Sequence, residues 1–240
     1  MFSKAGDFSP SVVLGIVAHP DDMEFIAGGS IARWIKAGAT VHYLVLTNGN
    51  RGANRPTTPK SLRSTRQQEQ RQAADILGVS ELMFADYDDC CLENCEAVKK
   101  DIVRAIRRLR PDTIITIDPT LVYCAEQGYI NHPDHRAAGQ ATLDAVFPLA
   151  RDQLSFPELI TDEQLQPHEV TNLLLFNLNQ ANFYVDITDT ISTKLLALAA
   201  HRSQFTDNQQ ISAKVHDLAV KNGSQCDTDC AESFMHITIS

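Results

Sequence analysis

Short apolar runs alternate with amphipathic segments over the first two thirds of the chain. The first run covers residues 11–17 and the second covers 41–46, with a predicted helix at about 25–38 between them. Apolar runs of this length are typical of strands buried on both faces, whereas recurrence every three to four residues indicates a helix. A repeated strand–helix–strand order predicts parallel strands joined by right-handed crossovers. We therefore expect an α/β fold with a Rossmann-like, mostly parallel sheet and helices on both faces.

The alternation continues with four predicted elements, in this order: a helix over 61–77, a strand over 82–85, a helix over 94–109 and a strand over 113–117. An irregular stretch follows from Asp118 to Asn131. Pro133 then favours the first turn of another helix, which we expect to run toward Pro148.

The remainder of the chain breaks this order and predicts a smaller mixed part. The pattern indicates strands at 173–176 and 183–186, helices at 188–204 and about 209–222, and a closing strand at 234–239. We interpret residues 1–150 as a Rossmann-like catalytic core. Residues 151–240 would then supply strands and helices that complete the same domain and its pocket.

Composition narrows the classes of partner. The chain has 240 residues, 43% of them hydrophobic, and a formal net charge of -9, which argues against a nucleic-acid partner. No segment is apolar for long enough to span a bilayer, and residues 1–7 lack the apolar core of a secretory signal. We therefore expect a cytoplasmic protein without a membrane partner, with six reduced cysteines. A homo-oligomer is left open.

Two polar segments stand where strands are predicted to end. Ala18-His19-Pro20-Asp21-Asp22-Met23-Glu24 lies directly between the first strand and the first helix. His132-Pro133-Asp134-His135 occupies the corresponding place after the strand at 113–117. Ligands bind at the carboxyl ends of the strands in open α/β sheets, so we expect both segments to border one crevice.

These segments contain the donors of a metal site. Catalytic zinc commonly has three protein ligands and one position left open for water. His19 and Asp22 can supply two ligands, and either His132 or His135 can supply the third. Water at the open position would have its pKa lowered toward neutrality. We predict Zn²⁺ as the cofactor, with other divalent cations as alternatives.

We expect the acid and the histidine that do not bind the metal to have separate catalytic roles. Adjacent carboxylates repel each other, so if Asp22 binds the cation, Asp21 can accept a proton as general base. The histidine that does not bind metal, held by a carboxylate such as Asp134, can stabilise charge on the substrate oxygen. Each segment alone is also explained by a hydrogen-bonded surface pair or a helix cap. Their joint occurrence at strand ends favours catalysis.

The two segments resemble the signatures of the LmbE-like (PIG-L) zinc-dependent deacetylases. That family has Ala-His-Pro-Asp-Asp-x-Glu after its first strand and a later His-Pro-Asp-His, here at 18–24 and 132–135. Arg66-Gln67-Gln68-Glu69 is similar to the family's Arg-x-x-Glu helix. The resemblance continues at 106–112 and in the C-terminal part, so it covers most of the chain.

The resemblance implies a role for each matching residue: His19, Asp22 and His135 as zinc ligands, Asp21 as general base, and His132 as oxyanion stabiliser or general acid. It also implies that Arg66 contacts a sugar and that Asp89 contacts a hydroxyl. Members of the family remove an acetyl group from N-acetylglucosamine units on inositol conjugates, malate conjugates or chitin disaccharides. The expected substrate is therefore a small amino sugar.

One loop departs from the family pattern. Many members carry Glu after Thr-x-Gly, where this chain has Asn50 followed by Arg51. Because this loop helps to shape the pocket, we count Arg51 among the expected substrate contacts. We interpret the chain as a deacetylase of an N-acetylated amino sugar. The alternatives are an amidase acting on a larger acyl or thiol sugar conjugate, and a non-catalytic sugar-binding protein.

Overall fold

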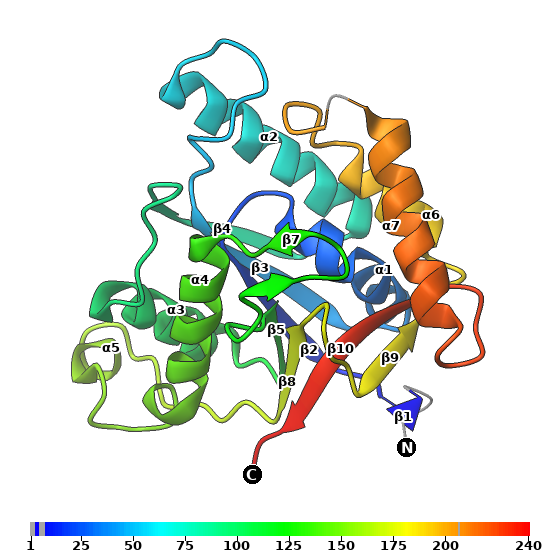
Figure 1. Ribbon diagram of the computed structural model, residues 1–240. Helices are drawn as coiled ribbons and strands as arrows, with labels where there is room; N and C mark the ends of the chain where they lie inside the picture. The colour runs from blue at the N-terminus through cyan, green and yellow to red at the C-terminus, as the bar shows by residue number, and fades with distance from the viewer. Residues whose placement is uncertain (1–2, 5–7, 206) are drawn as a thin grey trace.

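The computed structural model describes residues 3–4, 8–205 and 207–240 (Figure 1). Within these residues the main sheet has eight strands in the order β1-β9-β10-β8-β5-β2-β3-β4. The strands are β1 (Ser3–Lys4), β2 (Val12–Val17), β3 (Thr40–Thr47), β4 (Glu81–Tyr87), β5 (Thr113–Ile117), β8 (Asn172–Phe176), β9 (Phe183–Asp186) and β10 (Ala231–Thr238). Only β10 pairs antiparallel with its neighbours in this sheet. The predicted mostly parallel sheet with a mixed C-terminal part is confirmed.

Helices cover both faces of the sheet (Figure 1). Side chains that alternate along β2 enter two separate cores, because successive residues of a strand point to opposite faces. The helices are α1 (Asp22–Lys36), α2 (Pro59–Leu77), α3 (Glu96–Leu109), α4 (Pro133–Asp144), α5 (Pro157–Thr161), α6 (Ile191–Leu198) and α7 (Asn208–Gly223). Val13 and Val17 pack with α1, α2, α6 and α7, whereas Leu14 and Ile16 pack with α3 and α4.

Three predicted segments differ from the structure. The helix expected over 188–204 is reduced to α6, because tertiary contacts hold the following turns: Ser203 donates from its backbone N–H and its hydroxyl to Glu69 on α2. The irregular stretch before α4 contains a small hairpin, β6 (Tyr123–Cys124) and β7 (Tyr129–Ile130). Beyond α4 the chain forms a π-helical turn, η1 (Ala145–Leu149), instead of continuing as α-helix.

The order of the strands creates a crevice between β2 and β5. From β2 the chain passes through α1 to β3 and then to β4 on one side; α3 next returns it to β5 on the other side of β2. The direction of winding therefore reverses between β2 and β5, which is where open α/β sheets bind ligands. No helix in the described part of the chain is long and apolar enough to cross a membrane.

Candidate active site

Three potential metal ligands converge in this crevice. Nδ1 of His19 lies 3.1 Å from Nε2 of His135 and 3.6 Å from Oδ2 of Asp22. Nε2 of His135 lies 3.1 Å from Oδ1 of Asp22. Donors that share one tetrahedral zinc at about 2.0–2.1 Å are about 3.4 Å apart. The spacing and chemistry of this donor set therefore fit a divalent cation.

The groups behind the two histidines set their tautomers. Nδ1 of His135 donates to Oδ1 of Asn131 at 2.8 Å, which leaves the lone pair on Nε2. Nε2 of His19 faces Oδ2 of Asp134 at 3.2 Å and Oδ1 of Asp89 at 3.1 Å, so in the neutral ring Nε2 carries the proton and Nδ1 carries the lone pair. Both lone pairs are thus on the nitrogens that approach Asp22, as metal binding requires.

Asp134 lies closer to His19 than to His132. Its carboxylate is buried and accepts hydrogen bonds from Nε2 of His19 and from the backbone N–H of Cys90 at 2.7 Å. Its Oδ1 lies 4.0 Å from Nδ1 of His132, and that nitrogen caps α4 by accepting from the backbone N–H of Asp134 at 3.2 Å. Asp134 therefore orients His19, a potential metal ligand.

His132 is suited to donate a hydrogen bond. Because its Nδ1 accepts from the helix, the proton of the neutral ring is on Nε2. Burial lowers the pKa of His132, and the nearby His19 lowers it further. The side chain is thus a neutral donor next to the cluster of potential ligands.

The charges around the cluster favour a bound cation. Burial would raise the pKa of Asp22, but His135 and His19 hold it well below its usual range. Burial would lower the pKa of His19, but its contacts with Asp134, Asp22 and Asp89 raise it well above its usual value. Three carboxylates around one imidazole create a strongly negative site, which a divalent cation would neutralise.

Asp21 stands beside the cluster in an unusual backbone conformation. Its φ of 93° is in the left-handed region, and its backbone N–H donates to Oε1 of Gln70 at 2.9 Å. Burial raises its pKa, the Arg66 guanidinium opposes that shift, and the charge of Asp22 adds to it, so that the pKa is about 6. A carboxylate with a pKa close to neutrality meets the requirement for a general base.

A buried chain of hydrogen bonds behind Asp21 was not predicted. Gln70 donates from Nε2 to Oε1 of Glu24 at 2.9 Å, and Oε2 of Glu24 pairs with Nε2 of His201 at 3.2 Å. The side chains of Glu24 and His201 are fully buried. Glu24 belongs to the first signature and His201 to the C-terminal resemblance, but no local pattern connects them.

The expected substrate contacts occupy different positions. Arg66 is buried and donates to the carbonyl oxygens of Pro20 and Arg51 and to Oδ2 of Asp89 at 3.2 Å. It therefore joins three loops at the site, and its contact with a sugar stays a prediction. The side chain of Arg51 is exposed, and its Nη2 lies 3.8 Å from Sγ of Cys91.

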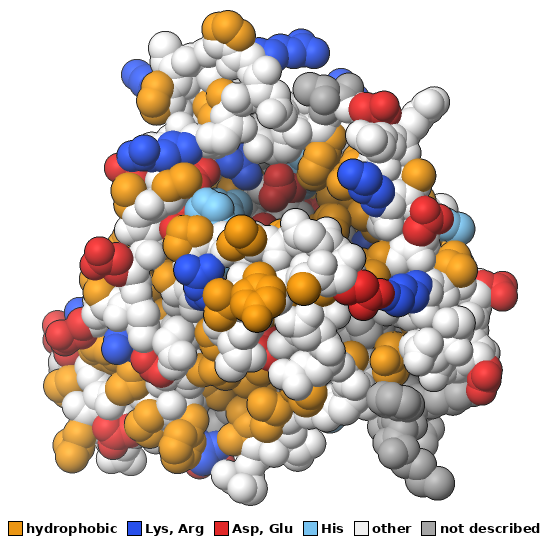
Figure 2. Space-filling view, in the orientation of Figure 1, with side chains coloured by type: hydrophobic (Ala, Val, Ile, Leu, Met, Phe, Trp, Pro, Cys, Tyr) orange, Lys and Arg blue, Asp and Glu red, His pale blue; other side chains and the backbone are white. Residues whose placement is uncertain are grey.

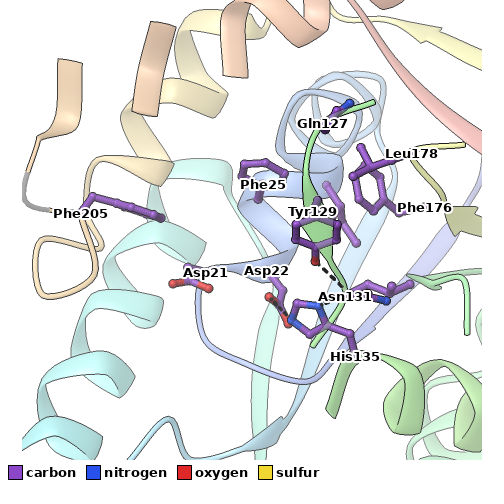
Figure 3. A pocket seen from close by; sticks show the side chains of 12 residues that line it. Asp21, Asp22, Phe25, Gln127, Tyr129, Asn131, His135, Phe176, Leu178 and Phe205 are labelled. Atoms are coloured by element: carbon purple, nitrogen blue, oxygen red, sulfur yellow. Dashed lines mark hydrogen bonds and ion pairs between the residues drawn. The ribbon is translucent and has the colours of Figure 1, made fainter. Parts of the chain in front are cut away.

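A cavity of about 250 Å³ lies next to Asp21, Asp22 and His135 (Figure 3). On the surface, histidine and acidic side chains are visible in a hollow of this face (Figure 2). Sequence reasoning missed the cavity, because its walls come from scattered apolar positions without a motif. Its other lining residues are Phe25, Ile26, Ile117, Gln127, Tyr129, Asn131, Phe176, Leu178 and Phe205.

Comparison with known proteins connects this geometry to a family. A sequence model described as PIG-L, GlcNAc-PI de-N-acetylase, matches residues 14–146. Diacetylchitobiose deacetylase of Thermococcus kodakarensis is 34% identical over 197 residues, which span 82% of this chain and 71% of that protein. A probable N-acetyl-alpha-D-glucosaminyl L-malate deacetylase 2 of Bacillus anthracis is 28% identical over 80% of this chain and 81% of that protein.

A solved structure extends the similarity to the fold. N,N'-diacetylchitobiose deacetylase from Pyrococcus horikoshii, solved with an inhibitor, matches with a TM-score of 0.87 and 29% identity. The match covers 95% of this chain and 84% of that one. The C-terminal strands and helices beyond the family model are therefore shared as well. Together with the two signatures, these matches show that the chain belongs to the PIG-L family of deacetylases.

Proposed function

We propose that this protein is a metal-dependent hydrolase that removes the acetyl group from an N-acetylated amino sugar of the N-acetylglucosamine type. The observation that carries the proposal is the convergence of His19, Asp22 and His135 beside Asp21. The names of the relatives support the substrate class, since they are deacetylases of diacetylchitobiose and of an N-acetylglucosaminyl malate. A non-catalytic sugar-binding protein would have no use for a proton acceptor beside a cation site.

Zn²⁺ is the cation we propose. Two imidazole nitrogens and one carboxylate oxygen form a donor set that catalytic zinc uses in other hydrolases. When bound, zinc would lower the pKa of a water molecule toward neutrality and polarise the acetyl carbonyl. The residues behind the ligands, Asn131 and Asp134, keep both imidazoles in the ligating tautomer.

The protein groups then move the protons. Asp21, with a pKa of about 6, accepts a proton from the attacking water. Nε2–H of His132 donates to the carbonyl oxygen as negative charge develops there. Asp21 or His132 returns a proton to the departing amine. Arg66 and Asp89 would contact the sugar, and the exposed Arg51 would contact a part of the substrate that extends toward solvent.

We also propose a cytoplasmic location. All six cysteines of the chain carry free thiols. Free thiols suit a reducing compartment, where disulfides rarely persist.

Acetate release from N-acetylglucosamine and its conjugates, measured together with metal content, tests the proposal. Asp21→Asn should keep its metal and lose about a hundredfold or more in turnover, whereas His135→Ala should lose the metal. His216→Ala, at an exposed position of α7, is the matched control and should change neither. Wild-type turnover in Asp21→Asn would overturn the assignment of the base.

A further inference from the structure

The cavity beside the cluster is too large for an acetyl group. It measures about 250 Å³, and Asp21, Asp22 and His135 form part of its wall. An apolar cavity of about 150 Å³ is large enough to bind benzene. The single methyl of an acetyl group would therefore leave most of this space unfilled.

Apolar side chains from separate elements form most of the remaining wall (Figure 3). Phe25 and Ile26 come from α1, Ile117 ends β5, and Phe176 ends β8. The rings of Phe25 and Phe176 pack edge to face with centroids 6.4 Å apart, and Ile26 and Ile117 are almost completely buried. Packing against the core thus forms the cavity in advance of any ligand.

Two of the three neutral polar residues of the lining, Tyr129 and Asn131, form hydrogen bonds within the protein. The hydroxyl of Tyr129 donates to Oδ1 of Asn131 at 2.9 Å, and the same oxygen accepts from Nδ1 of His135. Nδ2 of Asn131 donates to the carbonyl oxygen of Leu121 at 2.7 Å. Gln127, the third neutral polar residue of the wall, is exposed and can still bind a ligand. Apart from Gln127 and the charged residues of the cluster, a sugar ring inside the cavity would meet apolar side chains, so most of its buried hydroxyls would lack partners, which is costly.

Two charged side chains, Arg66 and Asp89, contact the cluster from outside the cavity and make that side strongly polar. Arg66 lies 3.5 Å from Oδ2 of Asp21, and Asp89 lies 3.1 Å from Nε2 of His19, yet neither lines the cavity. An amide at the cluster has two halves, a hydroxyl-rich amine and an apolar acyl chain. The chemistry of the two surfaces assigns the amine to the polar side and the acyl chain to the cavity.

We propose that this cavity is an acyl pocket, and that the enzyme hydrolyses N-acyl amino sugars with straight aliphatic acyl groups of about four to eight carbons. The inference rests on the proposed hydrolase function and extends its substrate class. In the reaction, water adds to the amide carbon and the C–N bond breaks. The products are the free amino sugar and a carboxylate with the chain length of the acyl group.

A series of N-acetyl, N-butyryl, N-hexanoyl and N-octanoyl glucosamine tests the proposal. We expect kcat/KM to rise about three- to fivefold for each added methylene until the cavity is filled. A kcat/KM that is highest for acetyl and falls with each methylene would overturn the proposal. A matching series of O-alkyl N-acetylglucosaminides tests the other apolar occupant. A gain in that series without a gain in the N-acyl series would assign the cavity to the aglycone and overturn the acyl pocket.

A wall variant tests the location of the chain. Leu178 lines the cavity, so Leu178→Trp should shorten it and reduce the hexanoyl-to-acetyl ratio of kcat/KM at least about tenfold. Leu154→Trp is the matched control, because Leu154 is 85% exposed and lies away from the cavity. An unchanged ratio in a folded Leu178→Trp enzyme would count against the pocket.

A binding measurement separates the pocket from the reaction. By calorimetry we expect hexanamide to bind the metal-loaded protein about a hundredfold more tightly than acetamide, with a negative heat-capacity change. Tight hexanamide binding without hydrolysis of any N-acyl glucosamine would support the pocket and refute the proposed function. Acetate release with equal affinity for the two amides would support the function and refute the pocket.

Discussion

Asp21 has a backbone conformation that its neighbours must maintain. A residue other than glycine in the left-handed region pays about 1–3 kcal/mol, and the backbone N–H of Asp21 is held by Gln70. Gln70→Leu removes this bond and the bond to Glu24 at similar volume. We expect kcat to fall about tenfold or more, with KM and metal content nearly unchanged, in steady-state kinetics with metal analysis.

Gln72→Leu provides the control, because Gln72 is exposed on the same helix. A Gln70→Leu enzyme with wild-type kcat would show that the conformation of Asp21 does not depend on this amide.

The residues of the site were predictable to the extent that the chain keeps them in short segments. His19, Asp21 and Asp22 follow one strand, and His132 and His135 follow another, so the topology alone brings them together. The residues that hydrogen-bond to the segment at 18–24 from the protein interior are distant in sequence. They lie in or near helices whose sequence patterns indicate only which positions are buried. Gln70 and His201 are therefore found only through the packing of α2 and of the turns after α6 against α1.

His201 gives the buried network a pH dependence. Burial on its own would lower the pKa of His201, but its bond to Glu24 and the charges of Asp21 and Glu69 raise it above 6.5. A group whose pKa is higher in the folded protein than in the unfolded chain contributes its full stabilisation at pH values below the unfolded-state pKa. This stabilisation is lost as the pH rises through the folded-state pKa. The stability advantage of wild type over His201→Gln should therefore shrink between about pH 6 and about pH 9.

Urea unfolding of both proteins at the two pH values measures this change, together with the change that the substitution causes in the titration of Glu24, Asp21 and Glu69, which interact with His201; groups distant from His201 cancel in the difference. An advantage that is the same at both pH values would mean that His201 does not change its protonation within this range.

Helix α4 contains His135, is capped by His132 and must approach β5 closely. A Cβ atom on Gly139 would lie 2.2 Å from the carbonyl oxygen of Ile117, which is far inside contact distance. Gly139→Ala should displace α4, destabilise the protein by about 1–3 kcal/mol and weaken metal binding. Gln140→Ala, at an exposed position of the same helix, should leave metal affinity unchanged when both variants are compared by urea unfolding and metal titration.

Periodicity predicted the elements that form the crevice, and it failed where tertiary contacts override local preference. The strand at 113–117 has the predicted bounds, because an apolar run marks it locally. The helix α2 ends at Leu77 as predicted, because Gly78 follows it. The helix expected over 188–204 ends early, since Glu69 on a distant helix bonds the turn at Ser203. No signal confined to the segment itself indicates such a contact.

The C-terminal part, residues 151–240, is joined to α1 by buried hydrogen bonds. Glu232 on β10 accepts hydrogen bonds from the backbone N–H groups of Gly29 and Ser30 in α1, at 2.9 and 2.7 Å. Its carboxylate also pairs with Lys194 of α6, and Lys194 donates to the carbonyl oxygen of Phe25. The side chains of Glu232 and Lys194 are buried, so residues 151–240 share a polar core with the segment that carries the site.

Because these contacts join the two parts, we expect the protein to unfold as one cooperative unit. Trp34, the single tryptophan, is buried on α1, so its fluorescence reports the N-terminal part, while circular dichroism reports all helices. In urea the two transitions should coincide. Lys194→Met, which leaves the buried Glu232 without its cationic partner, should shift both by the same amount, equivalent to about 3–5 kcal/mol. Separate transitions, or a shift of only one, would mean that the two parts fold independently and that residues 151–240 are an appended domain.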